Sequence, residues 1–358
     1  MYFICQESNR YALKKGFHNV SVTVEELYQY FAIVILPGYV PVASRRMFWE
    51  TKADTFNPLV SNTMSRNTFE SIHRFLHFCN NDTFDKNDNV AKMRQLIDHL
   101  NRIFTECIQP LGTHFSLEEA MGLYYGRHSM KQFIRGKPIR FGFKFWCLTT
   151  SDGYLIKFEP YLGSGDKLKG KTLGSSVTEK MCLNFIPRKS IVFIDNYFNS
   201  LPLLETLSKH ELYGVGTIRS DRVEEAPLKE LKKEKRGSHF TLYDKKANIT
   251  LTRWHDNSQV NVATNLNDES ISKTKSSCTR WFKKERSKIA VEQPSIINFY
   301  NNEMGGVDQF DQMRGLYRSK MRSKKWYWSF FRFCLNGAVV NMRYLYRRCS
   351  TNGAMPLL

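Results

Sequence analysis

The stretch GGVDQFDQM at residues 305–313 carries two acids, Asp308 and Asp311, at the start of a predicted helix. Residues three apart on a helix share one face, so both carboxylates would point the same way. Carboxylates are preferred ligands of Mg²⁺, and a helix that presents two of them suits one side of a metal site. The stretch therefore predicts an acidic helix face late in the chain.

Two upstream stretches each add an acid to an apolar run of a strand's length. FSLEEAM at residues 115–121 contains Glu118, and IVFIDNYF at residues 191–198 contains Asp195. Phosphodiester chemistry with two metals needs carboxylates that hold two divalent ions roughly 3.5 to 4 Å apart. If the strands and the helix meet, all four acids would surround a site for two Mg²⁺ ions.

Each acid also has a purely structural interpretation. Asp308 and Asp311 are first-turn acids that the helix dipole favours, Asp195 with Asn196 can cap a turn, and Glu118 can be a solvated strand residue. The occurrence of all of them on three different elements favours a shared site.

Residues 1–110 have the pattern of a helical region. TVEE at residues 23–26 has the capping-box form and predicts a helix from about 24 to 36, which the sequence LPG then ends. Apolar residues at helical spacing predict a second helix after residue 67 and a third through residues 93–103.

The pattern changes at residue 111 to alternating strands and helices. The predicted strands cover 115–121, 141–150, 154–161, 190–194 and 213–218, and the predicted helices cover 175–183 and 201–207. A meander of three strands followed by this alternation implies a mixed sheet flanked by helices. Residues 111–219 are therefore the first part of an α/β core.

Residues 220–293 interrupt this core. They begin with a mixed-charge run and then show short strands at 240–243, 249–254 and 260–264, which indicates a β-rich insertion. Helical pattern returns in residues 294–350, with an aromatic helix that begins near Trp326. We expect this segment to supply the last helices of the core.

The net charge indicates a polyanionic partner. The chain has 53 Lys and Arg against 34 Asp and Glu, a charge of +19, and double-stranded DNA fits this balance better than a small-molecule substrate. A chain that is merely basic and soluble is the alternative. Eight scattered cysteines without metal-binding spacing indicate reduced thiols, and no secretory signal pattern is present. The apolar stretches are too short or too polar for a membrane span.

Basic side chains gather in two places, each with aromatic residues nearby. The first cluster follows Glu118 and contains Arg127, Lys131, Arg135 and Lys137, and the second follows Asp311 and contains Arg318, Lys320, Arg322, Lys324 and Lys325. Both are candidates for phosphate contacts with DNA. The first could equally be a solvated strand face, and the second also has the composition of a nuclear-import patch.

The three acidic stretches resemble the catalytic blocks of piggyBac-type transposases. MSRN at residues 64–67, YGVGTIR at 213–219 and YRSK at 317–320 add to the resemblance. It implies an RNase H-like core, a helical region for dimerisation and DNA binding, and a β-rich insertion. It also implies that the acids bind two Mg²⁺ ions, that a water nicks the element's end, that a hairpin forms, and that joining occurs at TTAA.

Asp195, Asp308 and Asp311 match the family's acids, but Glu118 stands where active relatives have Asp. The additional methylene would move the carboxylate, and a displacement of about 1 Å can cost about a hundredfold in rate. Glu119 cannot substitute, because adjacent strand residues point to opposite faces. We also expect the C-terminal Cys-rich zinc domain of relatives to be absent. The resemblance implies that this domain recognises the terminal repeats of the element, so we expect that recognition to be lost as well.

We therefore expect a domesticated, nuclear, transposase-derived DNA-binding protein, able to form a homodimer, whose catalysis is compromised. One alternative is an active Mg²⁺-dependent transposase or nuclease that cuts and joins at TTAA sites. The other is a protein-interaction scaffold that does not bind DNA.

Overall fold

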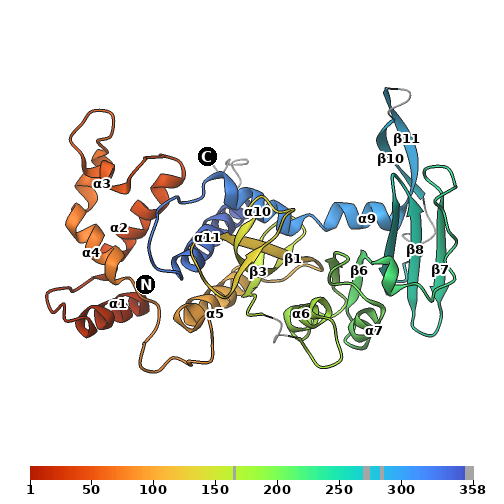
Figure 1. The fold of residues 1–358 in the computed structure, drawn as a ribbon, viewed down its shortest axis with the longest axis horizontal. Helices are drawn as coiled ribbons and strands as arrows, with labels where there is room; N and C mark the ends of the chain where they lie inside the picture. Colours follow the sequence, from red (N-terminus) through yellow and green to blue (C-terminus); the bar gives the residue numbers. More distant parts are fainter. Residues whose placement is uncertain (164–166, 269–274, 283–285, 351–358) are drawn as a thin grey trace. The chain divides into compact units, whose positions relative to one another are not determined.

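The computed structural model describes residues 1–163, 167–268, 275–282 and 286–350 (Figure 1). Contacts divide the chain into two compact units. The first, here the helical unit, is made of Met1–Glu106, Met121–Lys144 and Asp311–Leu358; the second, here the sheet unit, is made of Cys107–Ala120 and Phe145–Phe310. This division groups segments that are distant in sequence, so the predicted boundaries at 110, 219 and 293 stay predictions.

The helical unit contains the predicted N-terminal helices. Its N-terminal elements are α1 (Tyr2–Lys14), α2 (Val24–Ile35), η1 (Leu36–Gly38), η2 (Arg45–Trp49), α3 (Pro58–Thr63), α4 (Arg66–Phe75) and α5 (Ala91–Glu106). The predicted capping box forms at the start of α2. Thr23 Oγ1 accepts a hydrogen bond from the Glu26 amide at 3.1 Å, and the Glu26 carboxylate accepts one from the Thr23 amide at 2.9 Å.

Two long helices carry the C-terminal region. They are α10 (Gly306–Leu316) and α11 (Trp328–Cys349). The aromatic helix was expected near Trp326 and begins two residues later, because its N-cap is Tyr327. α11 buries Phe330, Phe331 and Phe333, and it packs against α5 within the helical unit.

A nine-stranded mixed sheet confirms the predicted fold class. Its order is β2-β3-β1-β5-β6-β9-β8-β7, with β4 paired to β3. The strands are β1 (His114–Leu123), β2 (Lys131–Phe133), β3 (Phe141–Thr150), β4 (Leu155–Pro160), β5 (Ile191–Ile194), β6 (Tyr213–Thr217), β7 (His239–Asp244), β8 (Ile249–His255) and β9 (Gln259–Thr264). β1, β5 and β6 pair in parallel, and β9 joins β6 antiparallel.

Helices and aromatic side chains cover the centre of the sheet. α6 (Leu173–Cys182) and α7 (Leu201–Lys209) lie in the connections around β5, and α9 (Ser295–Glu303) follows the insertion (Figure 1). Phe193 of β5 is fully buried in a cluster with Val215, Trp254 and Ile296. Val192 and Ile194, which point to the opposite face, are also fully buried, so β5 is buried on both faces, as its continuous apolar run predicts.

The insertion is β-rich, as predicted, and its strands extend the main sheet. β7, β8 and β9 continue the sheet beyond β6 through antiparallel pairs. A second, two-stranded sheet follows, formed by β10 (Lys275–Phe282) and β11 (Ser287–Pro294). The sequence did not predict β10 and β11, or the three-residue β2. Among the described residues, no helix combines the length and apolar character that crossing a membrane requires.

Candidate carboxylate centre

Strand pairing brings Glu118 and Asp195 to the same level of the sheet. β1 and β5 are parallel, and the last residues in register are Leu117 and Ile194. Each acid follows its registered residue directly. Neighbouring strands lie about 4.8 Å apart, so the two carboxylates leave adjacent positions. Both side chains are partly exposed. The two apolar runs thus form neighbouring strands, and each run ends beside one of the two acids.

The start of α10 packs onto the same part of the sheet. Ser116 and Glu118 share one face of β1, because side chains alternate along a strand. Ser116 Oγ donates to the Met304 carbonyl at 2.6 Å, just before α10 begins. Gly306 lies so close that a Cβ there would overlap the Thr150 carbonyl and Thr149 Oγ1. Only glycine permits this approach.

Asp308 is two residues beyond this contact and is exposed. The glycine contact therefore fixes the helix turn from which its carboxylate projects. Because Ser116 and Glu118 face the α9–α10 junction, Asp308 is placed on the side of the sheet where Glu118 lies.

Tyr300 of α9 links the three acids. Its hydroxyl is hydrogen-bonded to Thr217, and burial raises the pKa of Tyr300 to about 12. The carboxylates of Asp195, Glu118 and Asp308 all raise this pKa further. Because electrostatic interactions weaken with distance, all three acids lie near one phenol. Tyr300 was not among the residues predicted for the site.

The loop that carries Asp195 is held by its own amides. Asp195 Oδ1 accepts a hydrogen bond from the Tyr197 amide at 2.9 Å, and its carbonyl accepts one from the Asn199 amide at 3.1 Å. The carboxylate thus closes a turn, as the structural interpretation of Asp195 and Asn196 predicted. One oxygen is used in this way, and the turn fixes the direction of the side chain.

Arg222 clamps the same loop from outside. It belongs to a short 3₁₀ turn, η4 (Ser220–Arg222), and its Nη1 donates to the carbonyls of Asn196 at 3.0 Å and Asn199. Burial lowers the pKa of Arg222, while Asp195 raises it. Sequence reasoning missed Arg222 because its partners are backbone atoms that carry no side-chain signal.

Asp311 has a different environment from the other three acids. It lies in the helical unit, where its Oδ1 forms an ion pair with Arg314 Nη2 at 2.6 Å. Arg314 also donates to the Met121 carbonyl at 2.8 Å and lies over the Phe333 ring. The Asp311 carboxylate therefore balances a buried guanidinium, and the centre is built here from Glu118, Asp195 and Asp308.

The chemistry of these three acids suits a hard divalent cation. Carboxylate oxygens are the ligands that Mg²⁺ and Mn²⁺ prefer. Within the described ranges, however, no three His, Cys, Asp or Glu side chains are arranged closely enough to hold an ion. The donor type fits, and side-chain rotation would be needed to close a coordination shell.

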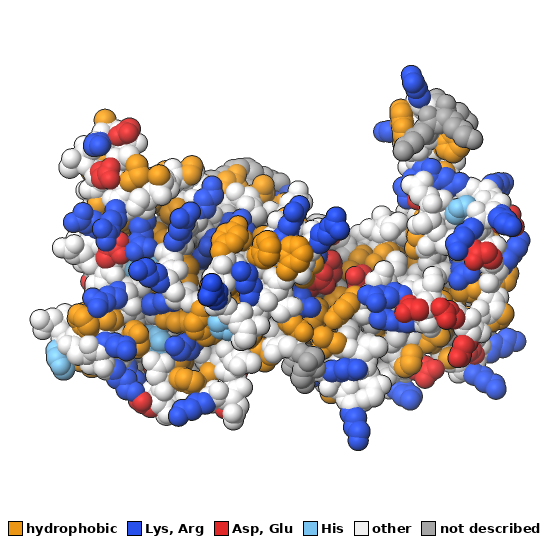
Figure 2. Space-filling view, viewed as in Figure 1, with side chains coloured by type: hydrophobic (Ala, Val, Ile, Leu, Met, Phe, Trp, Pro, Cys, Tyr) orange, Lys and Arg blue, Asp and Glu red, His pale blue; other side chains and the backbone are white. Residues whose placement is uncertain are grey.

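The predicted basic residues differ in how available they are. Arg127, Arg135, Lys320, Arg322 and Lys324 are exposed, whereas Lys131, Lys137, Arg318 and Lys325 are partly buried. Lys131 Nζ donates to the Tyr125 and Gly126 carbonyls at 3.3 and 3.2 Å, within its own loop. Figure 2 shows many further lysine and arginine side chains on the visible face of the helical unit.

Lys325 stabilises a helix end. Its ammonium donates to the carbonyls of His73 at 3.2 Å and Leu76 at 2.9 Å, where α4 ends. Free carbonyls at a helix C-terminus favour a cation. Burial lowers the pKa of Lys325 to about 8. This position makes Lys325 a poor phosphate ligand, unlike its exposed neighbour Lys324.

Comparisons with known proteins identify the family. The family model described as Transposase IS4 matches residues 2–342. The human piggyBac transposable element-derived protein 2 is 38% identical over 99% of this chain and 61% of its own length. The human piggyBac transposable element-derived protein 3 is 40% identical over 96% of this chain and 58% of its own length. The chain thus spans less than two thirds of these relatives.

A solved structure shares the fold. It is the synaptic complex of a piggyBac transposase with hairpin DNA. The match covers 99% of the chain described here and 74% of the transposase chain in that complex. The TM-score is 0.80 at 20% sequence identity. The likeness in fold and the sequence matches together show that this chain belongs to the piggyBac transposase family and is transposable element-derived.

Proposed function

We propose that this transposase-derived chain is a domesticated nuclear protein that binds double-stranded DNA and cleaves it weakly or not at all. The observation that carries this proposal is the position of Glu118. It stands beside Asp195 at the end of a parallel ladder, and the resemblance of its block to the family's catalytic blocks implies an Asp at this place. The core that holds it is RNase H-like in this proposal.

Two Mg²⁺ ions are the proposed cofactors, with Glu118, Asp195 and Asp308 as the main donors. A bound divalent ion would activate a water and stabilise the leaving oxygen of a phosphodiester. The chain's own part is positioning. The Tyr197 amide and Arg222 orient Asp195, Gly306 sets the approach of Asp308, and Tyr300 supplies a neutral hydroxyl beside the acids.

Glu118 weakens this arrangement because its carboxylate is one methylene further from the backbone than that of Asp. The charge is kept, but the additional methylene displaces the carboxylate, and a displacement of about 1 Å can cost about a hundredfold in rate. The second candidate function is an active transposase that cuts and joins at TTAA. The negative charge that Glu118 retains at this position favours it.

DNA binding is supported by the net charge of +19 and by exposed basic side chains. A homodimer and a nuclear location belong to the same proposal. A protein-interaction scaffold remains the candidate from another class. It differs in one measurable property: binding through phosphate contacts must weaken steeply with added salt.

A cleavage assay tests the catalytic part. A TTAA-flanked element end is incubated with Mg²⁺ and the native chain, Glu118→Asp or Asp195→Ala. We expect little or no cleavage by the native chain and stronger cleavage by Glu118→Asp. Cleavage by the native chain as strong as that by Glu118→Asp, and lost in Asp195→Ala, would establish the active transposase instead.

A further inference from the structure

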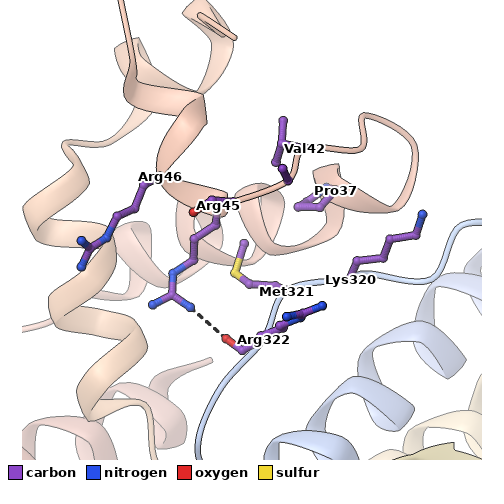
Figure 3. Close-up of a pocket in the computed structure, with 9 residues that line it drawn as sticks. Pro37, Val42, Arg45, Arg46, Lys320, Met321 and Arg322 are labelled. Atoms are coloured by element: carbon purple, nitrogen blue, oxygen red, sulfur yellow. Dashed lines mark hydrogen bonds between the residues drawn. The ribbon is translucent and has the colours of Figure 1, made fainter.

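The helical unit contains a pocket with a cationic rim. Its volume is about 460 Å³, and residues 42–46 and 320–322 line it together with Pro37 (Figure 3). Arg45 and Arg46 come from the start of η2, whereas Lys320 and Arg322 come from the segment between α10 and α11. We call this segment, residues 317–327, the strap.

Backbone contacts fix the strap against α2 and η1. Ser319 Oγ donates to the Val34 carbonyl at 2.6 Å, and the Tyr317 carbonyl lies so close to Gly38 that a Cβ there would overlap it. Trp328 Nε1 donates to the Met321 carbonyl at 2.8 Å. An irregular segment is thus held in one position from both sides.

This fixed backbone alternates buried and exposed side chains. Met321 is 3% exposed and forms part of the apolar floor with Pro37, while Lys320 and Arg322 are exposed on either side of it. Among the described residues, no acidic side chain pairs with Lys320 or Arg322. Their charges therefore remain available to a ligand.

Arg45 connects the two walls of the pocket. Its Nη1 donates to the Arg322 carbonyl at 2.8 Å (Figure 3). Its Nε and Nη2 donate to the Glu70 carboxylate at 3.0 and 2.6 Å. Arg46 also contacts Glu70, at 3.4 Å, and its side chain is 68% exposed. One carboxylate against four cations leaves the pocket positively charged.

We propose that this pocket seats the sugar-phosphate backbone of a DNA strand, with Lys320 and Arg322 as phosphate ligands. Arg45 is the positioning residue that holds the strap in place. The inference rests on the proposed DNA binding and names one contact site for it.

The pocket's size and floor favour a strand over a free anion. A volume of this order suits a ligand with several atoms beside the phosphate. Val42 is partly exposed and offers apolar surface for deoxyribose carbons above the buried Pro37 and Met321, and the cations on the rim are placed for the phosphates on either side. An acidic peptide would carry similar charge without the sugar.

The test is the salt dependence of duplex binding by the full chain. Fluorescence anisotropy is measured with a labelled duplex of about 30 base pairs, for the native chain and for the double variant Lys320→Gln/Arg322→Gln. The matched control is Lys52→Gln/Lys86→Gln, which removes two exposed charges of the same unit. Circular dichroism and thermal unfolding confirm that all three chains fold alike.

We expect the pocket variant to bind about tenfold more weakly than the native chain at low salt. The slope of log affinity against log salt should decrease in magnitude by about 1.8, because two phosphate contacts are lost. The control should keep the native slope within about 0.4, since its lysines contact no ordered strand.

Other outcomes contradict the inference in distinguishable ways. A native chain whose binding is absent or insensitive to salt removes the proposed function and the pocket's role together. Native binding with a pocket variant that matches the control removes only the pocket's role. Inorganic phosphate and poly-glutamate are also added as competitors at equal charge concentration. If phosphate displaces the duplex only when the pocket is intact, the site binds a free anion. If poly-glutamate does so, the site binds an acidic protein.

Discussion

Leu117 of β1 lies in parallel register with Ile194 of β5, and the residues that follow them are Glu118 and Asp195. This pairing explains why two segments 77 positions apart contribute to one charged centre. Parallel strands end at the same edge of a sheet, and ligand sites in α/β proteins form at that edge. The centre is therefore a consequence of topology.

The first prediction concerns the glycine that lets α10 approach the sheet. Gly306→Ala should lower the free energy of unfolding by about 1–3 kcal/mol, because a Cβ would overlap backbone and side-chain atoms of β3. Gly315→Ala is the matched control on the same helix, where nothing lies within 4 Å. It should stabilise the protein by about 0.5–1 kcal/mol. Urea titrations measure both, and equal effects would contradict the packing described for Gly306.

The second prediction concerns the Arg222 clamp. Arg222→Gln removes the donor to the Asn196 and Asn199 carbonyls, so the loop after Asp195 should open more often. Hydrogen exchange of the Tyr197–Asn199 amides should accelerate about tenfold or more, since a lost charged hydrogen bond costs about 1.5–3 kcal/mol. Arg219→Gln changes an exposed neighbour and should leave these amides as they are. Unchanged exchange in Arg222→Gln would exclude a positioning role.

The third prediction uses pH. Burial lowers the pKa of His73 to about 4, and its Nδ1 lies 2.8 Å from the Tyr30 hydroxyl. The unfolded chain takes up the proton near pH 6.5, before the folded chain does, so stability is fully present above pH 6.5 and is lost as pH falls towards 4. The loss should approach about 3 kcal/mol. His73→Gln should show a flatter profile in urea titrations between pH 7 and 4; an equally steep profile would assign the acid sensitivity elsewhere.

The fourth prediction separates two neighbouring lysines. Lys325→Met should lower the free energy of unfolding by about 1.5–3 kcal/mol, because the carbonyls that end α4 lose a charged donor. Its effect on the salt slope of DNA binding should be small. Lys324→Met should do the reverse, with stability unchanged and a slope reduced by about 0.9 for one phosphate. A salt slope that is reduced in Lys325→Met and unchanged in Lys324→Met would instead identify Lys325 as the DNA contact.

Much of the fold could be predicted because its elements have strong periodic patterns. The capping box at Thr23 and the apolar run before Asp195 each specify an element without help from distant residues. β10 and β11 lack this advantage: basic and polar residues alternate with few buried ones, and the register that pairs the two strands is not visible in either of them alone. β2 is too short to leave a pattern.

Members of the candidate site could be predicted only where side-chain chemistry is visible in the sequence. Glu118, Asp195 and Asp308 stand out as acids on apolar elements. Tyr300 does not, since a tyrosine on an amphipathic helix is normally a core residue. Arg45 acts through a carbonyl 277 positions away, a distance that no local pattern spans.

The convergence of Glu118, Asp195 and Asp308 on Tyr300 is tested most directly by titrating a single ¹⁹F probe. 3-Fluorotyrosine at position 300 keeps the hydroxyl, and fluorine lowers the phenol's pKa into a measurable range. Glu118→Gln, Asp195→Asn and Asp308→Asn should each lower the pKa of the probe relative to the parent chain, because each removes a negative charge near the phenol. Asp244→Asn, at the far end of β7, should leave it unchanged. Identical titration curves for all five proteins would show that the three acids do not share one centre.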